Sequence, residues 1–456
     1  MYLGIDIGAS FCKAVLVESG NEISKTFTAP MPNFLDRRPG SKLKREISIK
    51  KIIKVIVKVV RSVINGLHGE IDGIGITGQM HGILLVGESN QPLTDFISWQ
   101  DERTIMPFPN GTNQSYLKFI KENLCEYRTL TGIDIRSGML GPVLFWLKNN
   151  RELPNMRFVK ASFLPDYIAA LLTGTDPVCD PTNAAGSGVF DLQRGSWLDP
   201  YIRLTGISED VLPRVVPSGT VVGETNRWTS QLIGIREGVP VFVSMGDYHA
   251  ALFASALDAE SLSFNIGTGA QVSILTKDPK YSADIETRPF FDGYSINCIS
   301  GLPGGRAISL FADFIFSTVA LFSSPPEKQD IILKLESLGL EQFDRTAVVC
   351  DPRFYNPRNE TDANPGFFHL NDLNFNPVDL FYALLEGMLH QYFKAFGLIC
   401  PYKKVDDFQI VLSGGVARKS MLLQKIMNSN YGLRFRLSGY AEEAAAGAAL
   451  IAKKYH

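Results

Sequence analysis

The chain has 456 residues, too many for one compact core, which predicts two domains of roughly two hundred residues each with a ligand cleft between them. Its 45 basic and 47 acidic side chains leave a net charge of -2, so the chain lacks the positive net charge that would attract nucleic acid or anionic lipid. The six cysteines lack paired metal spacing, and no window reaches the ~20 apolar residues that cross a bilayer. We therefore expect a cytoplasmic protein without nucleic-acid or membrane partners.

The first hundred residues alternate strands with a helix. Residues 2–30 predict three short strands in a β-meander, with a turn at Ser19-Gly20-Asn21. From Lys50 the basic residues recur at spacings of three and four, which indicates an amphipathic helix. The following run DGIGITGQMHGILLV predicts a buried strand that ends at a polar turn. Strand, helix and strand in this order indicate an α/β fold.

The second half of the sequence repeats this pattern. VFVSMGD after Val239-Pro240 predicts a strand, and SLSFNIGTGAQVSILT predicts a strand, a glycine turn and another strand. NIGTGAQ repeats the strand and small-residue turn of GIDIGAS, which suggests duplicated architecture. We expect the domain boundary near residue 245, between an N-terminal domain 1–244 and a C-terminal domain 245–456. Further on, Asn376-Pro377 predicts a helix start, DDFQIVLSGGVARKSMLLQKIM predicts strand, glycine loop and helix, and AEEAAAGAALIAKKY predicts a closely packed helix.

Three turns of small residues follow predicted strands, and they include Gly8 with Ser10, Gly267-Thr268-Gly269, and Gly414-Gly415 with Ala417. Backbone N–H groups at such turns can approach phosphate oxygens closely. A single turn of this kind is more often an ordinary tight connection. Three of them, divided between the two halves, favour a phosphate-binding site.

Two aspartates follow strands in places where phosphate chemistry would use them. Asp6 would need a cation such as Mg²⁺ between its carboxylate and a polyphosphate, although a turn-capping aspartate is the common alternative. Asp247 lies at the start of a predicted helix, where a simple helix cap is the ordinary interpretation. At the boundary between two phosphate-binding halves it could instead accept a proton from an attacking hydroxyl.

A mixture of polar and aromatic side chains suited to a polyol occurs in two short runs, QMHG and SWQDER. The first supplies Gln79, Met80 and His81, and the second supplies Trp99 and Asp101. Taken alone, His81 is an ordinary turn histidine and Trp99 an ordinary packing residue.

In this order, the segments resemble the FGGY family of carbohydrate kinases over nearly the whole chain. They are GIDIGAS, GIGITGQMHG, SWQDER, DPTNAAGSGVFD, MGDYHAA, NIGTGAQVS and LSGGVARKS. The resemblance implies an α/β fold of two actin-like, ribonuclease H-like lobes with a cleft between them. The sugar would lie against the N-terminal lobe, and ATP would be held by the C-terminal lobe.

The resemblance also implies roles for individual residues. Asp247 would be the general base, and Asp6 and Asp247 would serve Mg²⁺. The sugar would contact Gln79, Met80, His81, Trp99, Asp101, Asn183 and Asp247. The nucleotide would contact Asp6, Gly8, Ser10, Gly267, Thr268, Gly269, Gly304, Gly414, Gly415 and Ala417.

The implied reaction is the transfer of phosphate from ATP to the terminal primary hydroxyl of a ketose, by a monomer or a homodimer. The segments PFFDGYSI and GLPGG, and the pairing of WQD with NIGTGAQ, favour sedoheptulose, with xylulose or another pentulose as the alternative. A catalytically silent sugar- or nucleotide-binding regulator is the alternative from another class. Lys419, Ser420 and Arg306 depart from the family pattern near the expected adenine site.

Overall fold

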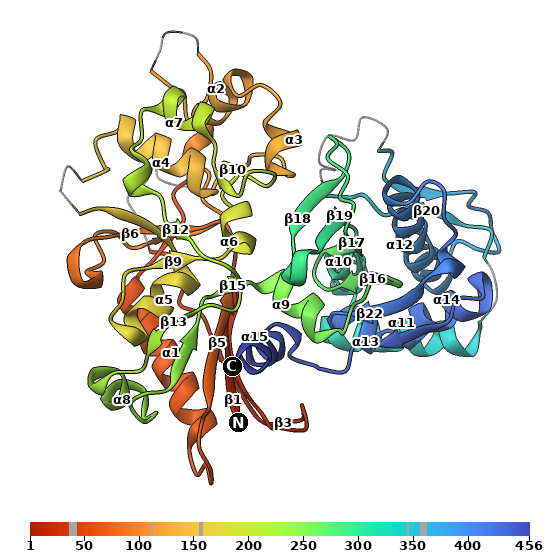
Figure 1. Ribbon diagram of the computed structural model, residues 1–456. Coiled ribbons are helices and arrows are strands. Elements are labelled where there is room, and N and C mark those ends of the chain that lie inside the picture. Colours follow the sequence, from red (N-terminus) through yellow and green to blue (C-terminus); the bar gives the residue numbers. More distant parts are fainter. Residues whose placement is uncertain (36–42, 110, 112, 155–157, 344–345, 356–362) are drawn as a thin grey trace.

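The computed structural model describes residues 1–35, 43–109, 111, 113–154, 158–343, 346–355 and 363–456. The chain forms two α/β lobes, with the first half of the sequence in one lobe and most of the second half in the other (Figure 1). Each lobe is built on a mixed β-sheet. Within these described ranges, no helix has the length and apolar character that crossing a membrane requires.

The main sheet of the N-terminal lobe has the strand order β13-β14-β5-β1-β2-β3, and β15 also pairs with β5. Its strands are β1 (Tyr2–Ile7), β2 (Phe11–Val17), β3 (Ile23–Pro30), β5 (Gly73–Gly78), β13 (Val221–Glu224), β14 (Pro240–Phe242) and β15 (Met245–Gly246). β1, β2 and β3 form the predicted antiparallel meander. The predicted amphipathic helix is α1 (Ile49–Ile64), which buries Ile52, Ile56 and Val60 against this sheet.

A second part of the N-terminal lobe surrounds a smaller sheet of order β4-β7-β6-β8. Its strands are β4 (Glu46–Ile47), β6 (Ile83–Val86), β7 (Phe96–Ile97) and β8 (Lys160–Phe163), and short pairs join β9 (Val178–Cys179) to β12 (Arg214–Val215) and β10 (Phe190–Asp191) to β11 (Ser196–Trp197). The helices of this lobe after α1 are α2 (Tyr116–Asn123), α3 (Tyr127–Thr131), α4 (Leu140–Asn149), α5 (Leu164–Thr173), α6 (Pro181–Ala185), α7 (Asp199–Thr205) and α8 (Arg227–Ile233).

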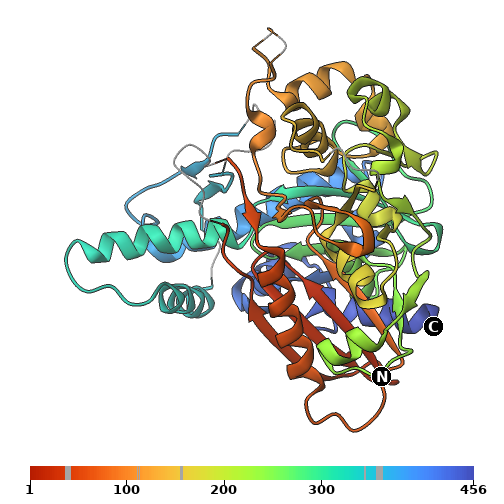
Figure 2. The same ribbon diagram turned by 90° about the vertical axis from the view of Figure 1, so that its left-hand side faces the viewer.

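The C-terminal lobe has one main sheet, of order β18-β19-β17-β16-β22-β23. Its strands are β16 (Ser261–Ile266), β17 (Ala270–Thr276), β18 (Glu286–Pro289), β19 (Ser295–Leu302), β22 (Gln409–Ser413) and β23 (Phe435–Leu437), and β20 (Val349–Asp351) pairs with β21 (Gly366–Phe368). The helices from Asp247 onward are α9 (Asp247–Ala254), α10 (Gly305–Ala320), α11 (Lys328–Glu341), α12 (Pro377–Ile399), α13 (Gly415–Lys419), α14 (Met421–Tyr431) and α15 (Glu443–Tyr455). Figure 2 shows α10 and α11 of the C-terminal lobe projecting beyond the rest of the molecule.

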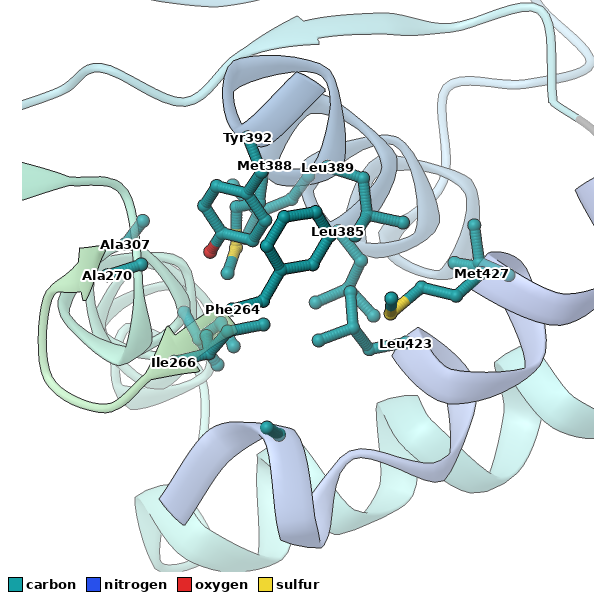
Figure 3. Packing of buried hydrophobic residues seen from close by; sticks show 14 of the residues in the cluster. Phe264, Ile266, Ala270, Ala307, Leu385, Met388, Leu389, Tyr392, Leu423 and Met427 are labelled. Carbon is teal, nitrogen blue, oxygen red and sulfur yellow. The ribbon is translucent and has the colours of Figure 1, made fainter. Parts of the chain in front are cut away.

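The core of the C-terminal lobe lies between its sheet and α12. Phe264 and Ile266 of β16 face Leu385, Met388 and Tyr392 of α12, and Leu423 and Met427 of α14 close the same cluster (Figure 3). The predicted helix start at Asn376 is confirmed, because its side chain accepts hydrogen bonds from the N–H groups of Val378 and Asp379, both at 3.0 Å.

The two main sheets repeat one arrangement, as the sequence predicted. In the N-terminal lobe β1 pairs antiparallel with β2 and parallel with β5, and in the C-terminal lobe β16 pairs antiparallel with β17 and parallel with β22. Asp6 faces Thr77 in the first sheet and Asn265 faces Ser413 in the second, so Asp6 and Asn265 occupy equivalent positions. Each precedes a glycine turn by two residues.

One predicted strand is divided in two. VFVSMGD forms β14 and β15, which are separated at Val243 and Ser244. Val243 N–H donates to the Thr220 carbonyl at 2.8 Å, and the Ser244 hydroxyl contacts Asp166 and Asn183. The strand prediction was too long because these tertiary contacts draw the two residues out of the sheet ladder.

The last helix of the chain returns to the first sheet. α15 packs on β1, β2 and β5 and against α9, and Figure 1 shows it beside the N-terminal strand. The contact is between backbones: a Cβ atom at Gly4 would lie 1.9 Å from the Ala445 carbonyl oxygen, and one at Gly447 would lie 1.9 Å from that of Ala250. The predicted close packing of this alanine-rich helix is confirmed.

We predict that Gly447→Ala destabilises the protein although alanine is the better helix former. The new methyl group meets the α9 backbone, so the free energy of unfolding should fall by about 1 to 3 kcal/mol or more. Gly397→Ala in α12 is the matched control, because nothing lies within 4 Å of its added Cβ, and it should be neutral or stabilising by about 0.5 kcal/mol. Urea unfolding of both variants measures the difference, and equal stabilities would contradict the packing argument.

Candidate active site

Three strand ends of the N-terminal sheet meet at one edge. β1 and β15 both run parallel to β5, with Ile7 and Gly246 each paired to Gly78. Because the carboxyl ends of parallel strands lie at the same edge of a sheet, the residues just beyond them are brought together. Asp6 near the end of β1, Gln79 after β5 and Asp247 after β15 therefore surround one point.

Both aspartates have raised pKa values, and the charge of Asp247 contributes to the shift of Asp6. Burial raises the pKa of Asp6 to about 8, with the Asp247 charge adding to the rise and the charge of Lys13 opposing it. Burial raises the pKa of Asp247 to about 6, against the lowering effect of the Tyr248 N–H and of Arg288. Asp247 Oδ1 accepts a hydrogen bond from Tyr248 N–H at 2.8 Å, so part of the helix-start interpretation is correct, while Gly246 holds the cap position itself.

This pair of carboxylates fits a hydrated divalent cation. Asp6 is only 8% exposed, and its Oδ1 has no hydrogen-bond partner. Mg²⁺ is commonly held by one or two carboxylates and completes its shell with water and phosphate oxygens. In the described part of the chain, no group of three or more histidine, cysteine or acidic side chains is placed to enclose a metal. Asp6 and Asp247 therefore suit a cation whose other ligands are water molecules and phosphate oxygens.

The sugar-side residues predicted from QMHG lie beside this edge. Gln79 is buried, its N–H donates to the Ile7 carbonyl at 3.0 Å, and its Oε1 has no partner. His81 has a positive φ of 80°, and its Nδ1 lies 2.6 Å from the Gly186 carbonyl. Burial and then the charge of Arg288 lower the pKa of His81 to about 4. The imidazole is therefore neutral at pH 7, with the proton on Nδ1 and Nε2 available as an acceptor.

Met80 and Asn183 complete this side of the site. A Cβ at Gly246 would lie 2.7 Å from Met80 Sδ, so Met80 packs directly against the residue before Asp247. Asn183, in α6, donates through Nδ2 to Ser244 Oγ at 3.0 Å and to Asp166 Oδ1 at 3.2 Å. Its Oδ1 is buried without a partner. Gln79, His81 and Asn183 thus each keep an acceptor that no protein donor uses.

The second predicted run divides between two environments. Trp99 is 40% exposed and lines a cleft of about 830 Å³ between the lobes. Asp101 is completely buried, and its oxygens accept from Arg103 Nε at 2.8 Å and from the Arg45 N–H at 2.7 Å. The structure brings Trp99 to the cleft, whereas it gives Asp101 a structural ion pair. A sugar contact by Asp101 stays a prediction.

The same cleft reaches the glycine turns of the C-terminal lobe. It joins Trp99 and the Gly132–Arg136 segment on one side to Thr268, Gly269, Gly304 and Arg306 on the other. Its volume is in the range of small-molecule sites. Gly305 N–H donates to Gly267 O, and Arg306 N–H to Thr268 O, both at 2.8 Å, which ties the turn to the start of α10.

Close backbone packing explains the glycines of this region. A Cβ at Gly304 would lie 2.7 Å from the Gly269 carbonyl carbon, and one at Gly414, where φ is +89°, would lie 2.6 Å from the Ile266 carbonyl. Gly267, Gly304 and Gly414 therefore come together, as a nucleotide site built from separate segments requires. In the N-terminal lobe, a Cβ atom at Gly8 would lie 3.8 Å from Oδ2 of Asp6, so this glycine borders the carboxylate. Ser10 is exposed on the turn after β1.

The residues around the third turn have different environments. No atom lies within 4 Å of a Cβ atom added at Gly415, whereas the Ala417 side chain is fully buried in the C-terminal core. Lys419 is exposed, and the Ser420 hydroxyl caps α14 by accepting from Leu423 N–H at 3.2 Å. The Arg306 guanidinium stacks over Tyr355, with 3.9 Å to the ring centroid. The side chain of Ser420 therefore serves as the N-cap of α14.

Sequence reasoning did not identify two groups at the sugar side. His249, next to Tyr248 in α9, is completely buried with both ring nitrogens unpartnered. Arg288, in β18 of the other lobe, places a guanidinium nitrogen 3.8 Å from Met80 Sδ. Arg288 lies in the segment before PFFDGYSI, but nothing in the sequence places this strand against the other lobe.

The comparisons identify the family. The N-terminal domain of the FGGY family of carbohydrate kinases matches residues 1–254, and the chain belongs to this family. It is 23% identical to the xylulose kinase of Staphylococcus xylosus, over 99% of this chain and 90% of that protein, and 22% identical to the sedoheptulokinase of Mus musculus, over 98% and 96%. A solved xylulose kinase from Rhodospirillum rubrum superposes with a TM-score of 0.83 at 20% identity, over 99% of this chain and 89% of that one. The predicted fold of two actin-like lobes is confirmed, and the protein is a carbohydrate kinase.

We predict that Asp6→Asn raises the unfolding temperature in Mg²⁺-free buffer at pH 8. The pKa of Asp6 rises on folding from 3.8 to about 8, so the folded protein holds a proton that the unfolded chain releases, and stability falls as the pH rises through this interval. Asparagine does not ionise, so Asp6→Asn removes this loss of stability at high pH. The gain should be several degrees at pH 8 and should shrink toward pH 4.5.

Thermal unfolding at a series of pH values measures this effect. Asp199→Asn is the control, because it makes the same substitution at an aspartate that is exposed to solvent. A stability difference between Asp6→Asn and the parent protein that does not depend on pH would contradict the assignment.

Proposed function

We propose that the protein transfers the γ-phosphoryl group of ATP to the terminal primary hydroxyl of a ketose. The observation that carries this proposal is the position of Asp247, at the end of β15, beside Asp6, among the unpaired acceptors Gln79 Oε1 and Asn183 Oδ1 and near the neutral imidazole of His81. Phosphoryl transfer needs mainly positioning and charge stabilisation, together with a base near the attacking hydroxyl.

Asp247 has the properties of that base. A pKa of about 6 leaves its carboxylate ionised at neutral pH, yet more basic than an ordinary aspartate. In the proposed reaction Asp247 accepts the proton of the sugar hydroxyl as the oxygen attacks the γ-phosphorus. The bond from that phosphorus to the bridging oxygen of ATP breaks, and ADP leaves.

Asp6 and Asp247 would hold the Mg²⁺ that accompanies ATP. When bound, the ion neutralises phosphate charge that would otherwise repel both carboxylates. Gly267 and Gly269 leave room for phosphate oxygens beside backbone N–H groups, while Gly8, Gly304 and Gly414 let the neighbouring backbone segments approach closely. Trp99 and Arg306 border the cleft between the lobes. This arrangement supports ATP in the C-terminal lobe, which we assign to residues 245–456, and sugar against the lobe of residues 1–244.

Sedoheptulose, giving sedoheptulose 7-phosphate, is our preferred substrate. The segments PFFDGYSI and GLPGG support it, while the relatives named for xylulose and for sedoheptulose are similar to this chain at nearly the same identity. Xylulose or another pentulose is the second candidate. A silent binding protein is disfavoured, because it would have no use for two adjacent carboxylates whose raised pKa values cost stability.

We predict that Asp247→Asn reduces turnover roughly 10²- to 10⁴-fold with ATP binding retained, because the amide keeps the shape but accepts no proton. A coupled assay of ADP release measures turnover, and calorimetry measures ATP binding. Asp199→Asn, which changes an exposed aspartate at the start of α7, serves as the control and should remain fully active. Turnover of Asp247→Asn equal to that of the control would rule out the base.

A substrate panel tests the choice of sugar. We expect sedoheptulose to give the highest kcat/KM among sedoheptulose, xylulose, ribulose and fructose with ATP and Mg²⁺. A higher value for xylulose or ribulose would replace sedoheptulose with a pentulose and leave the reaction class intact. No ADP release with any ketose would contradict the proposed function.

A further inference from the structure

Arg288 connects the C-terminal lobe to the sugar side of the N-terminal lobe. It lies in β18, the edge strand of the C-terminal sheet, and this strand packs against α6, which carries Asn183. Figure 1 shows β18 facing α6 across the junction of the lobes. The Thr287 N–H donates to the Gly132 carbonyl at 2.8 Å, so the strand is fixed to the N-terminal lobe next to Arg288.

The Arg288 guanidinium lies over the Tyr248 ring, 5.6 Å from the ring centroid, and its N–H donors have few protein partners although the residue is only 8% exposed. One terminal nitrogen donates to Glu286 Oε2 at 2.6 Å, and the other is 3.8 Å from Met80 Sδ. Nε is buried with no partner. A guanidinium carries five N–H donors, and burying them unpaired is costly. Donors directed at Met80, a predicted sugar contact, are therefore available to a ligand.

The charges around Arg288 include two carboxylates, those of Glu286 and Asp247, and the charge of Arg288 acts to lower the pKa of each. Glu286 is shared, because its Oε1 also accepts from Arg136 at 2.7 Å and from Ser300 Oγ at 2.8 Å. Burial alone would raise the pKa of Glu286, but Arg288 and Arg136 outweigh it and hold that pKa well below its usual range. His81 and His249 are neutral, since burial and then Arg288 lower the pKa of each. Two guanidinium groups thus share the carboxylate of Glu286.

We propose that Arg288 is a specificity-determining residue that the C-terminal lobe contributes to the ketose site, where its guanidinium donates hydrogen bonds to a hydroxyl or carbonyl oxygen of the sugar. This inference rests on the proposed function. Glu286 acts as a positioning residue, since it fixes the guanidinium and also joins it to Arg136 of the N-terminal lobe. A ketose is thereby held from both lobes, by Arg288 on one side and by Gln79, His81 and Asn183 on the other.

Replacement of Arg288 by methionine and by lysine tests the contact. The KM for the ketose should rise about 10- to 100-fold in Arg288→Met, as expected when a hydrogen bond to a charged group is lost, with a smaller rise in Arg288→Lys. The KM for ATP should stay within about two-fold, because nothing in the proposal places Arg288 at the nucleotide. Arg434→Met, an exposed arginine of the same lobe, is the matched control and should leave both KM values unchanged.

Monodeoxy ketoses provide a readout that a merely structural role would not change. Removal of the accepting oxygen from the ketose should lower the kcat/KM of the parent protein. The factor should equal the one by which Arg288→Met lowers kcat/KM with the full ketose. On that analogue, Arg288→Met should lose nothing further. Ketose-induced stabilisation against thermal unfolding should fall in Arg288→Met, while ATP-induced stabilisation remains.

Two results overturn the inference: an unchanged ketose KM in Arg288→Met, or an equal loss on every analogue accompanied by a loss of ATP-induced stabilisation. Parent protein that neither binds nor phosphorylates a ketose would contradict the proposed function instead. The two failures are therefore distinguishable.

Discussion

The carboxyl ends of β1, β5 and β15 meet because the three strands run parallel, with β5 hydrogen-bonded to both of the others. This pairing places Asp6 and Asp247 close together, although more than half of the chain lies between them. Taking both carboxylates out of water and setting them side by side is unfavourable, and the raised pKa values of Asp6 and Asp247 express that cost. In the proposed function, a cation and phosphate oxygens that bind at this edge would offset the cost of burying the two carboxylates.

The position of Asp247 relative to Asp6 depends on a second contact, the backbone packing of α15. This helix lies on β1 and β5 through Gly4 and Gly75, and against α9 through Gly447. Asp247 is the first residue of α9, and Asp6 belongs to β1. The end of the chain therefore fixes Asp247 relative to Asp6, and a larger side chain at any of the three glycines would disturb this arrangement.

Several buried polar atoms without protein partners lie where we propose that the sugar binds. They include Gln79 Oε1, Asn183 Oδ1, Arg288 Nε and both ring nitrogens of His249. Buried polar groups in folded proteins are normally paired, so such a group of acceptors and donors points to a ligand that completes them. A polyhydroxy sugar offers both functions at each hydroxyl, and it matches a mixed set better than an apolar ligand would.

Features set by short stretches of sequence were predicted correctly. The β-meander of residues 2–30, α1, the glycine turns, the Asn376 cap and the alanine-rich last helix all follow from local periodicity and turn chemistry. The family motifs further indicated Asp6, Gln79, His81 and Asp247, which the structure brings to one place. Only the tertiary structure decided that Arg288 reaches the sugar side from the other lobe, that Asp101 is enclosed in an ion pair with Arg103, and that Ala417 is buried in the core. These outcomes depend on contacts between segments distant in the chain or on how the lobes pack, and a local pattern of residues contains no information about either.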